Sequence, residues 1–81
     1  MKILLVEDDK KIADFISKGL REAGFVVDVA HDGIEGLRLG QSVNYEAAVV
    51  DIMLPGLDGL SLIERLREKR ISTPVLILSA K

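Results

Sequence analysis

The stretch "ILLVEDD", residues 3–9, runs four apolar side chains directly into three carboxylates. An unbroken apolar run of this length is typical of a strand that is buried on both faces of a parallel sheet. In open α/β sheets, ligands bind beyond the carboxyl ends of the strands. The stretch therefore predicts a buried first strand whose end carries an acidic site.

Three more runs of apolar residues predict three more strands. They are residues 25–30, 47–50 and 75–78, and the last is expected to be a fourth buried strand. Segments with helical spacing of apolar residues separate these strands. The helices are expected over residues 10–23, around Ile34 and Leu37 after the turn "HDG", and around Leu60, Ile63 and Leu66 after the loop "MLPGLDG". This alternation is typical of a doubly wound α/β fold.

The first helix, residues 10–23, has recognisable ends and an apolar pattern. Asp8 or Asp9 is placed to cap its start, and Gly24 is placed to end its last turn. Its apolar residues recur at helical spacing: Ile12, Phe15, Ile16 and Leu20. The pattern predicts an amphipathic helix of about three to four turns.

The expected sheet is parallel and flavodoxin-like, with the strand order 2-1-3-4. In that order strand 3 crosses to the far side of strand 1, which leaves a crevice where their carboxyl ends diverge. Neighbouring strands lie about 4.8 Å apart, so Asp8 and Asp51 would face one small shared volume. Ser79, which ends strand 4, would stand on the other side of that volume.

Composition and charge exclude several classes of function. The 81 residues are 48% apolar and carry a net charge of −2, which favours one compact domain, or part of one, without a basic field for nucleic acid or membranes. The chain has no cysteine, which excludes disulfides and thiolate metal sites. No apolar run reaches the roughly 18 residues of a membrane span. We expect a cytoplasmic protein that itself binds neither DNA nor a membrane.

The acidic residues Glu7, Asp8 and Asp51 predict a cation site. Uncompensated carboxylates in one crevice repel one another and cost stability unless a positive group lies among them. Mg²⁺ prefers oxygen ligands and usually takes one or two carboxylates, which leaves positions for water and phosphate oxygens. Mg²⁺ is therefore the expected cofactor, in a site suited to phosphate chemistry.

Three segments resemble the signature segments of bacterial response-regulator receiver domains, in the order and spacing of that family. They are "LLVEDD", "VVDIMLPGLDG" and "VLILSA". The segments "MKILLVEDD" and "DIMLPGLDG" are most similar in sequence to regulators of the OmpR/PhoB class, which join a receiver to a winged-helix DNA-binding domain. The resemblance covers residues 1–81 and implies a partial receiver domain, without the family's fourth helix, fifth strand and fifth helix.

The resemblance implies a role for each matching residue. Asp51 would be the phosphoacceptor, which takes a phosphoryl group from a phosphohistidine of a sensor histidine kinase. Asp8 would bind Mg²⁺ directly, Glu7 through a water molecule, and Met53 through its backbone carbonyl. Ser79 would hydrogen-bond the phosphoryl group and move with it. The implied protein is a signalling phosphoacceptor rather than an enzyme, and it would regulate transcription through a DNA-binding domain absent from these residues.

Simpler interpretations compete with some of these roles. Acids at a strand-to-helix junction often only cap the helix, and this interpretation suits Asp9. A haloacid-dehalogenase-type phosphohydrolase needs a second aspartate where this chain has Met53, and the glycines at 33, 36 and 40 match no nucleotide-binding motif. The alternative that remains is a phosphorylation-independent, receiver-like interaction module. His31 lies in a turn with no acid or nucleophile in predicted reach and is expected to be a surface residue.

The resemblance stops before the family's fifth strand, and two expectations follow. The lysine that the family carries at the end of that strand has no counterpart, because Lys81 follows Ser79 on the loop after strand 4. Strand 4, residues 75–78, would be an apolar edge without a partner on one side. We expect either self-association through strand 4 or a longer chain that covers it.

Overall fold

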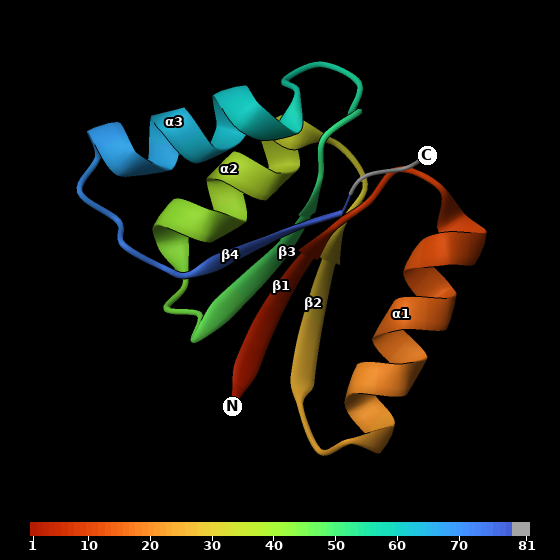
Figure 1. Ribbon diagram of the computed structural model, residues 1–81. Coiled ribbons are helices and arrows are strands. Elements are labelled where there is room, and N and C mark those ends of the chain that lie inside the picture. Colours follow the sequence, from red (N-terminus) through yellow and green to blue (C-terminus); the bar gives the residue numbers. More distant parts are fainter. Residues whose placement is uncertain (79–81) are drawn as a thin grey trace.

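Four parallel strands form one sheet in the order β2-β1-β3-β4, with helices on both faces (Figure 1). The computed structural model describes residues 1–78. The strands are β1 (Lys2–Val6), β2 (Val26–Ala30), β3 (Ala47–Asp51) and β4 (Val75–Leu78). The helices are α1 (Lys10–Glu22), α2 (Gly33–Ser42) and α3 (Gly59–Glu68). The fold class and the strand order expected from the sequence are confirmed.

The strand order places the ends of β1 and β3 side by side. Val6 pairs with Ala30 of β2 on one side and with Val50 of β3 on the other. The chain leaves β1 through α1 to reach β2, then crosses to the far side of β1 through α2 to enter β3 (Figure 1). The residues that follow Val6 and Val50 therefore lie next to each other at one edge of the sheet.

Two apolar clusters, one on each face of the sheet, hold the layers together. The first includes Leu4, Val6 and Val50 of the sheet and Leu62 and Leu66 of α3, all almost fully buried. The second lies under α1 and is built from Ile3, Leu5, Ala13, Val27 and Val49. Successive strand residues point to opposite faces, so an unbroken apolar run supplies both clusters.

Two of the apolar residues of α1 do not lie on its buried face. Phe15 is 82% exposed and Ile12 is 43% exposed, whereas Ala13 and Ser17 are buried. At about 100° per residue, Phe15 lies roughly 150° round the helix from the centre of the stripe that contacts the sheet. The small side chains at 13 and 17 let α1 approach the sheet, which turns the bulkier Phe15 to the surface.

Strand β4 also differs from the buried strand that its composition predicts. Leu76 is 66% exposed and Ile77 is 46% exposed, because β4 is the outer strand of the described sheet. This matches the expectation of an apolar edge. Among residues 1–78, no helix is both long and apolar enough to cross a membrane.

Candidate functional site

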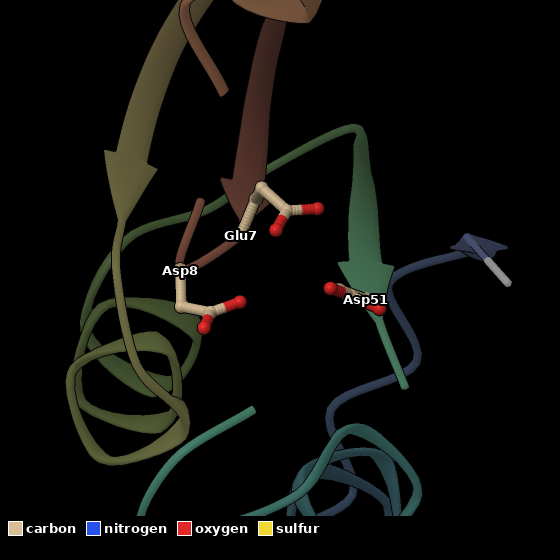
Figure 2. Close-up of side chains that lie close together, drawn as sticks. All are labelled: Glu7, Asp8 and Asp51. Carbon is tan, nitrogen blue, oxygen red and sulfur yellow. The ribbon is translucent and has the colours of Figure 1, made fainter. Parts of the chain in front are cut away.

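Three carboxylates meet at the carboxyl ends of β1 and β3. Glu7 and Asp8 directly follow β1, and Asp51 is the last residue of β3. One carboxylate oxygen from each residue lies within 4.8 Å of those of the other two. Figure 2 shows the three side chains directed toward one shared space. The structure therefore brings together three acids that the sequence analysis assigned to one site.

The backbone around the cluster is tied down on several sides. Glu7 donates its amide to the carbonyl of Ala30 at 2.9 Å, and the Asp9 amide donates to the Glu7 carboxylate at 3.0 Å. Gly59, the first residue of α3, lies so close to β3 that a Cβ there would overlap the Asp51 carbonyl. These contacts hold Glu7 and Asp51 in place while both are only 3% exposed.

The cluster is electrostatically unbalanced. Burial raises the pKa of the Glu7 carboxyl above its ordinary value, and the neighbouring Asp51 carboxylate raises it further. Within residues 1–78, the structure has one ion pair, between Arg38 and Glu35, and it includes no member of the cluster. Asp8 is exposed, so the cluster opens to solvent on one side. Such a set of oxygens suits a hard divalent cation.

Asp9 caps α1 and is not part of the cluster. Its carboxylate accepts the amides of Lys11 at 2.9 Å and Ile12 at 3.1 Å, which satisfies two donors of the first helical turn. Asp32 caps α2 and Asp58 caps α3 in the same way. The capping interpretation of Asp9 is confirmed.

The remaining predicted site residues have different outcomes. Met53 follows Asp51 by two residues, and its amide donates to Asp51 Oδ1 at 3.2 Å, so its backbone lies beside the cluster. Its side chain is 72% exposed, which fits a residue that acts through its backbone. Ser79 lies outside the described residues. The roles of Met53 and Ser79 remain predictions.

His31 makes a contact that the sequence analysis missed. It is exposed, as expected, but its Nδ1 lies 3.1 Å from the backbone carbonyl oxygen of Glu7. The available signal was the strand order, because His31 directly follows β2 and β2 is the neighbour of β1. A carbonyl is common to every residue, so no side-chain pattern marks its partner.

The sequence is similar to known transcriptional regulators. It is 44% identical over 80 residues to the transcriptional regulatory protein CusR of Escherichia coli strain K12. This match covers 99% of the chain but 35% of CusR, so the chain spans about a third of that relative's length.

Solved receiver domains have the same fold. The receiver domain of Francisella response regulator 1452 is 51% identical, with a TM-score of 0.94 over 98% of this chain and 65% of the other. The receiver domain of the Pseudomonas aeruginosa PAO1 sensor histidine kinase PA1611, with magnesium coordinated in its active site cleft, is 34% identical, with a TM-score of 0.95 over 99% of this chain and 67% of the other. The family model for the response regulator receiver domain matches residues 3–81. The chain therefore belongs to the response regulator receiver domain family.

Proposed function

We propose that Asp51 is the phosphoacceptor of a two-component signalling protein. One observation carries the proposal: Asp51 ends β3 with its carboxylate buried beside those of Glu7 and Asp8. A carboxylate can act as a nucleophile toward phosphorus, and positioning with charge neutralisation supplies most of the catalysis in phosphoryl transfer. An Asp51 oxygen forms the new bond to phosphorus as the bond from phosphorus to the histidine nitrogen of the donor breaks. The histidine nitrogen leaves with that electron pair.

The proposed cofactor is Mg²⁺, held by the acidic cluster. Asp8 and Asp51 supply carboxylate oxygens, Met53 its backbone carbonyl, and Glu7 acts through a water molecule. The geometry supports this set, because three carboxylates within 4.8 Å of one another form an oxygen-rich site that needs positive charge. When bound, the cation neutralises charge on the phosphoryl oxygens. The solved receiver domain of PA1611, which has magnesium in its cleft, supports the choice of metal.

The proposed partner is a sensor histidine kinase, and the proposed output is regulation of transcription. The similarity to CusR, a transcriptional regulatory protein, supports this output. DNA binding would belong to a further domain, because these 81 residues have no basic field. We further propose that residues 1–81 are the first part of a receiver domain. The same site would also promote loss of the phosphoryl group. The protein would work in the cytoplasm.

Phosphorylation by a small donor tests the proposal. A full-length protein that carries these residues should take phosphate from acetyl phosphate in the presence of Mg²⁺ and form a base-labile acyl phosphate. Asp51→Asn should abolish the label, and Ser79→Ala should keep it while weakening the transcriptional response. Label that persists in the Asp51→Asn protein, or that appears on His31 or Ser79, would overturn the assignment. Absence of any label in the parent would favour a phosphorylation-independent interaction module.

A further inference from the structure

The contact between His31 and Glu7 fixes the direction of one hydrogen bond. His31 Nδ1 lies 3.1 Å from the Glu7 backbone oxygen, and a carbonyl oxygen can only accept. Nδ1 therefore carries the proton and donates it to the carbonyl. The His31 ring is exposed, so its role is not to fill the core.

The Glu7 carbonyl belongs to the peptide group that leads into Asp8. The other end of Glu7 is also held, because its amide donates to Ala30 at 2.9 Å. The end of β2 thus holds residue 7 twice, through the carbonyl of Ala30 and the side chain of His31. A peptide group is planar, so fixing the carbonyl of residue 7 also fixes the direction in which the backbone enters Asp8. The Asp8 carboxylate depends on that direction to point into the cluster.

We propose that His31 is a positioning residue for the cation site, which orients the peptide between Glu7 and Asp8. The inference rests on the proposed function, because it assumes that Asp8 binds the metal. Groups that orient metal ligands commonly affect affinity although they do not touch the metal. Loss of one net hydrogen bond should weaken Mg²⁺ binding about two- to tenfold. His31 would act through the backbone carbonyl of Glu7, so it is a positioning residue and not a catalytic residue.

Two substitutions of similar size separate hydrogen bonding from bulk. In His31→Asn the side-chain nitrogen is bonded to Cγ, as Nδ1 is in histidine, so a donor stays near the Glu7 carbonyl. In His31→Leu no donor remains. We expect the leucine variant to bind Mg²⁺ about two- to tenfold more weakly than the parent by isothermal titration, and the asparagine variant to recover most of the affinity. Circular dichroism at the titration temperature checks that each protein is folded, and His31→Ala replaces the leucine variant if that one is not.

Asp8→Asn separates failure of this inference from failure of the proposed function. If Asp8→Asn and His31→Leu both bind Mg²⁺ as the parent does, the proposed metal site is wrong and the inference falls with it. If Asp8→Asn loses binding while His31→Leu keeps the parent affinity, only the role of His31 is overturned. Equal weakening by leucine and asparagine would also overturn it, because the donor would not be the cause. The amide resonance of Asp8 should shift in the leucine variant and stay near its parent position in the asparagine variant.

Discussion

The carboxylates of Glu7, Asp8 and Asp51 repel one another within the folded domain. Glu7 and Asp51 are each 3% exposed, and burial together with neighbouring charge raises the pKa of Glu7. Repulsion of this kind lowers stability when all the groups are ionised. A cation that binds only the folded state offsets the cost by mass action. The proposed metal binding therefore predicts a link between the cation and folding stability.

Asp51→Asn should stabilise the metal-free protein at neutral pH, because it removes a buried charge that repels the Glu7 carboxylate. Excess Mg²⁺ should raise the Tm of the parent and have a smaller effect on the variant. Thermal unfolding in EDTA and in Mg²⁺ measures both effects. The control is Glu64→Gln, which removes an exposed carboxylate of α3. The same change in Tm for both substitutions would show that overall charge, and not the cluster, is responsible.

A second buried polar contact, between Tyr45 and Asp28, predicts how stability depends on alkaline pH. Tyr45 is buried, and its hydroxyl donates to Asp28 Oδ2 at 2.7 Å. Burial and this hydrogen bond to a carboxylate raise the pKa of Tyr45 well above its ordinary value. The unfolded state therefore loses its proton first, near pH 10, and stability falls as the pH rises above that value.

Tyr45→Phe should lower the free energy of unfolding at neutral pH by about 1.5 to 3 kcal/mol, since it removes a hydrogen bond to a charged group. The variant should also lose the part of the alkaline slope that Tyr45 causes. Urea denaturation at pH 7 and at several pH values above 9 measures both effects. An unchanged slope above pH 9 would show that Tyr45 does not control it.

The sequence predicted that Glu7, Asp8 and Asp51 lie together, but it did not predict the contacts that support them. Glu7, Asp8 and Asp51 follow apolar strands directly, and strand order alone brings such positions together. His31 contacts the backbone carbonyl of Glu7. Every residue type has this carbonyl, so the contact cannot be predicted from the side chain at position 7. Side-chain chemistry at strand ends is therefore predictable from sequence, and backbone recognition between strand ends is not.

At the scale of elements, the glycines of α2 serve packing. A Cβ at Gly36 would lie 3.0 Å from the Val6 side chain, and one at Gly40 would lie 3.1 Å from Leu66. Because glycine has no Cβ, α2 can pack close to β1 and α3. The spacing of these glycines excluded a nucleotide-binding loop, but it did not indicate that they serve packing. Close approach of two elements depends on tertiary packing, which local sequence does not specify.

Two glycines at different places in helices should respond oppositely to alanine. A Cβ at Gly59 would overlap the Asp51 carbonyl and lie 2.9 Å from Ile52 Cα, so Gly59→Ala must push α3 from β3 and cost about 1 to 3 kcal/mol. Gly19 lies inside α1, and a Cβ added there would have nothing within 4 Å, so Gly19→Ala should stabilise by about 0.5 to 1 kcal/mol.

Denaturant unfolding of both glycine variants measures these changes. Gly59→Ala should also weaken Mg²⁺ binding, because the end of β3 carries Asp51. Gly19→Ala should leave metal binding unchanged, which makes it the matched control. A Gly59→Ala protein with parent stability and parent metal affinity would show that the end of β3 adapts without cost.

At the scale of the whole molecule, the sequence predicted the layers and strand order but not which faces are covered. Apolar runs at 3–6 and 47–50 became central strands, buried on both sides by α1 and by α2 with α3. The run at 75–78 is equally apolar, yet Leu76 and Ile77 are exposed because β4 lies outermost. An apolar composition indicates that a strand tends to be buried. Its place in the sheet decides whether it is buried in the structure.

The outer edge of β4 offers a defined set of backbone groups. Ala48 donates to the Pro74 carbonyl and Ile52 to the Leu78 carbonyl, so residues 74, 76 and 78 turn their backbone groups toward β3. Residues 75 and 77 alternate with them and present N–H and C=O outward. Two such edges related by a twofold axis perpendicular to the sheet would pair antiparallel, with Val75 opposite Ile77 of the second copy and Leu76 opposite Leu76. In this register every outward donor of one copy at these positions meets an acceptor of the other.

We predict that a chain of these 81 residues self-associates through this edge, because an apolar edge strand with free backbone groups templates pairing.

Ile77→Pro tests the proposed geometry of this pairing. It removes an N–H that points away from β3, so it should block pairing between copies and leave the contact with β3 intact. Leu76→Pro is the matched comparison, since it removes a donor that faces β3 and should destabilise the fold itself. Light scattering with intact mass should give a dimer for the parent and a folded monomer for Ile77→Pro. A strictly monomeric parent of 81 residues would contradict the prediction, and would mean that four strands complete more of the core than the exposure of Leu76 and Ile77 indicates.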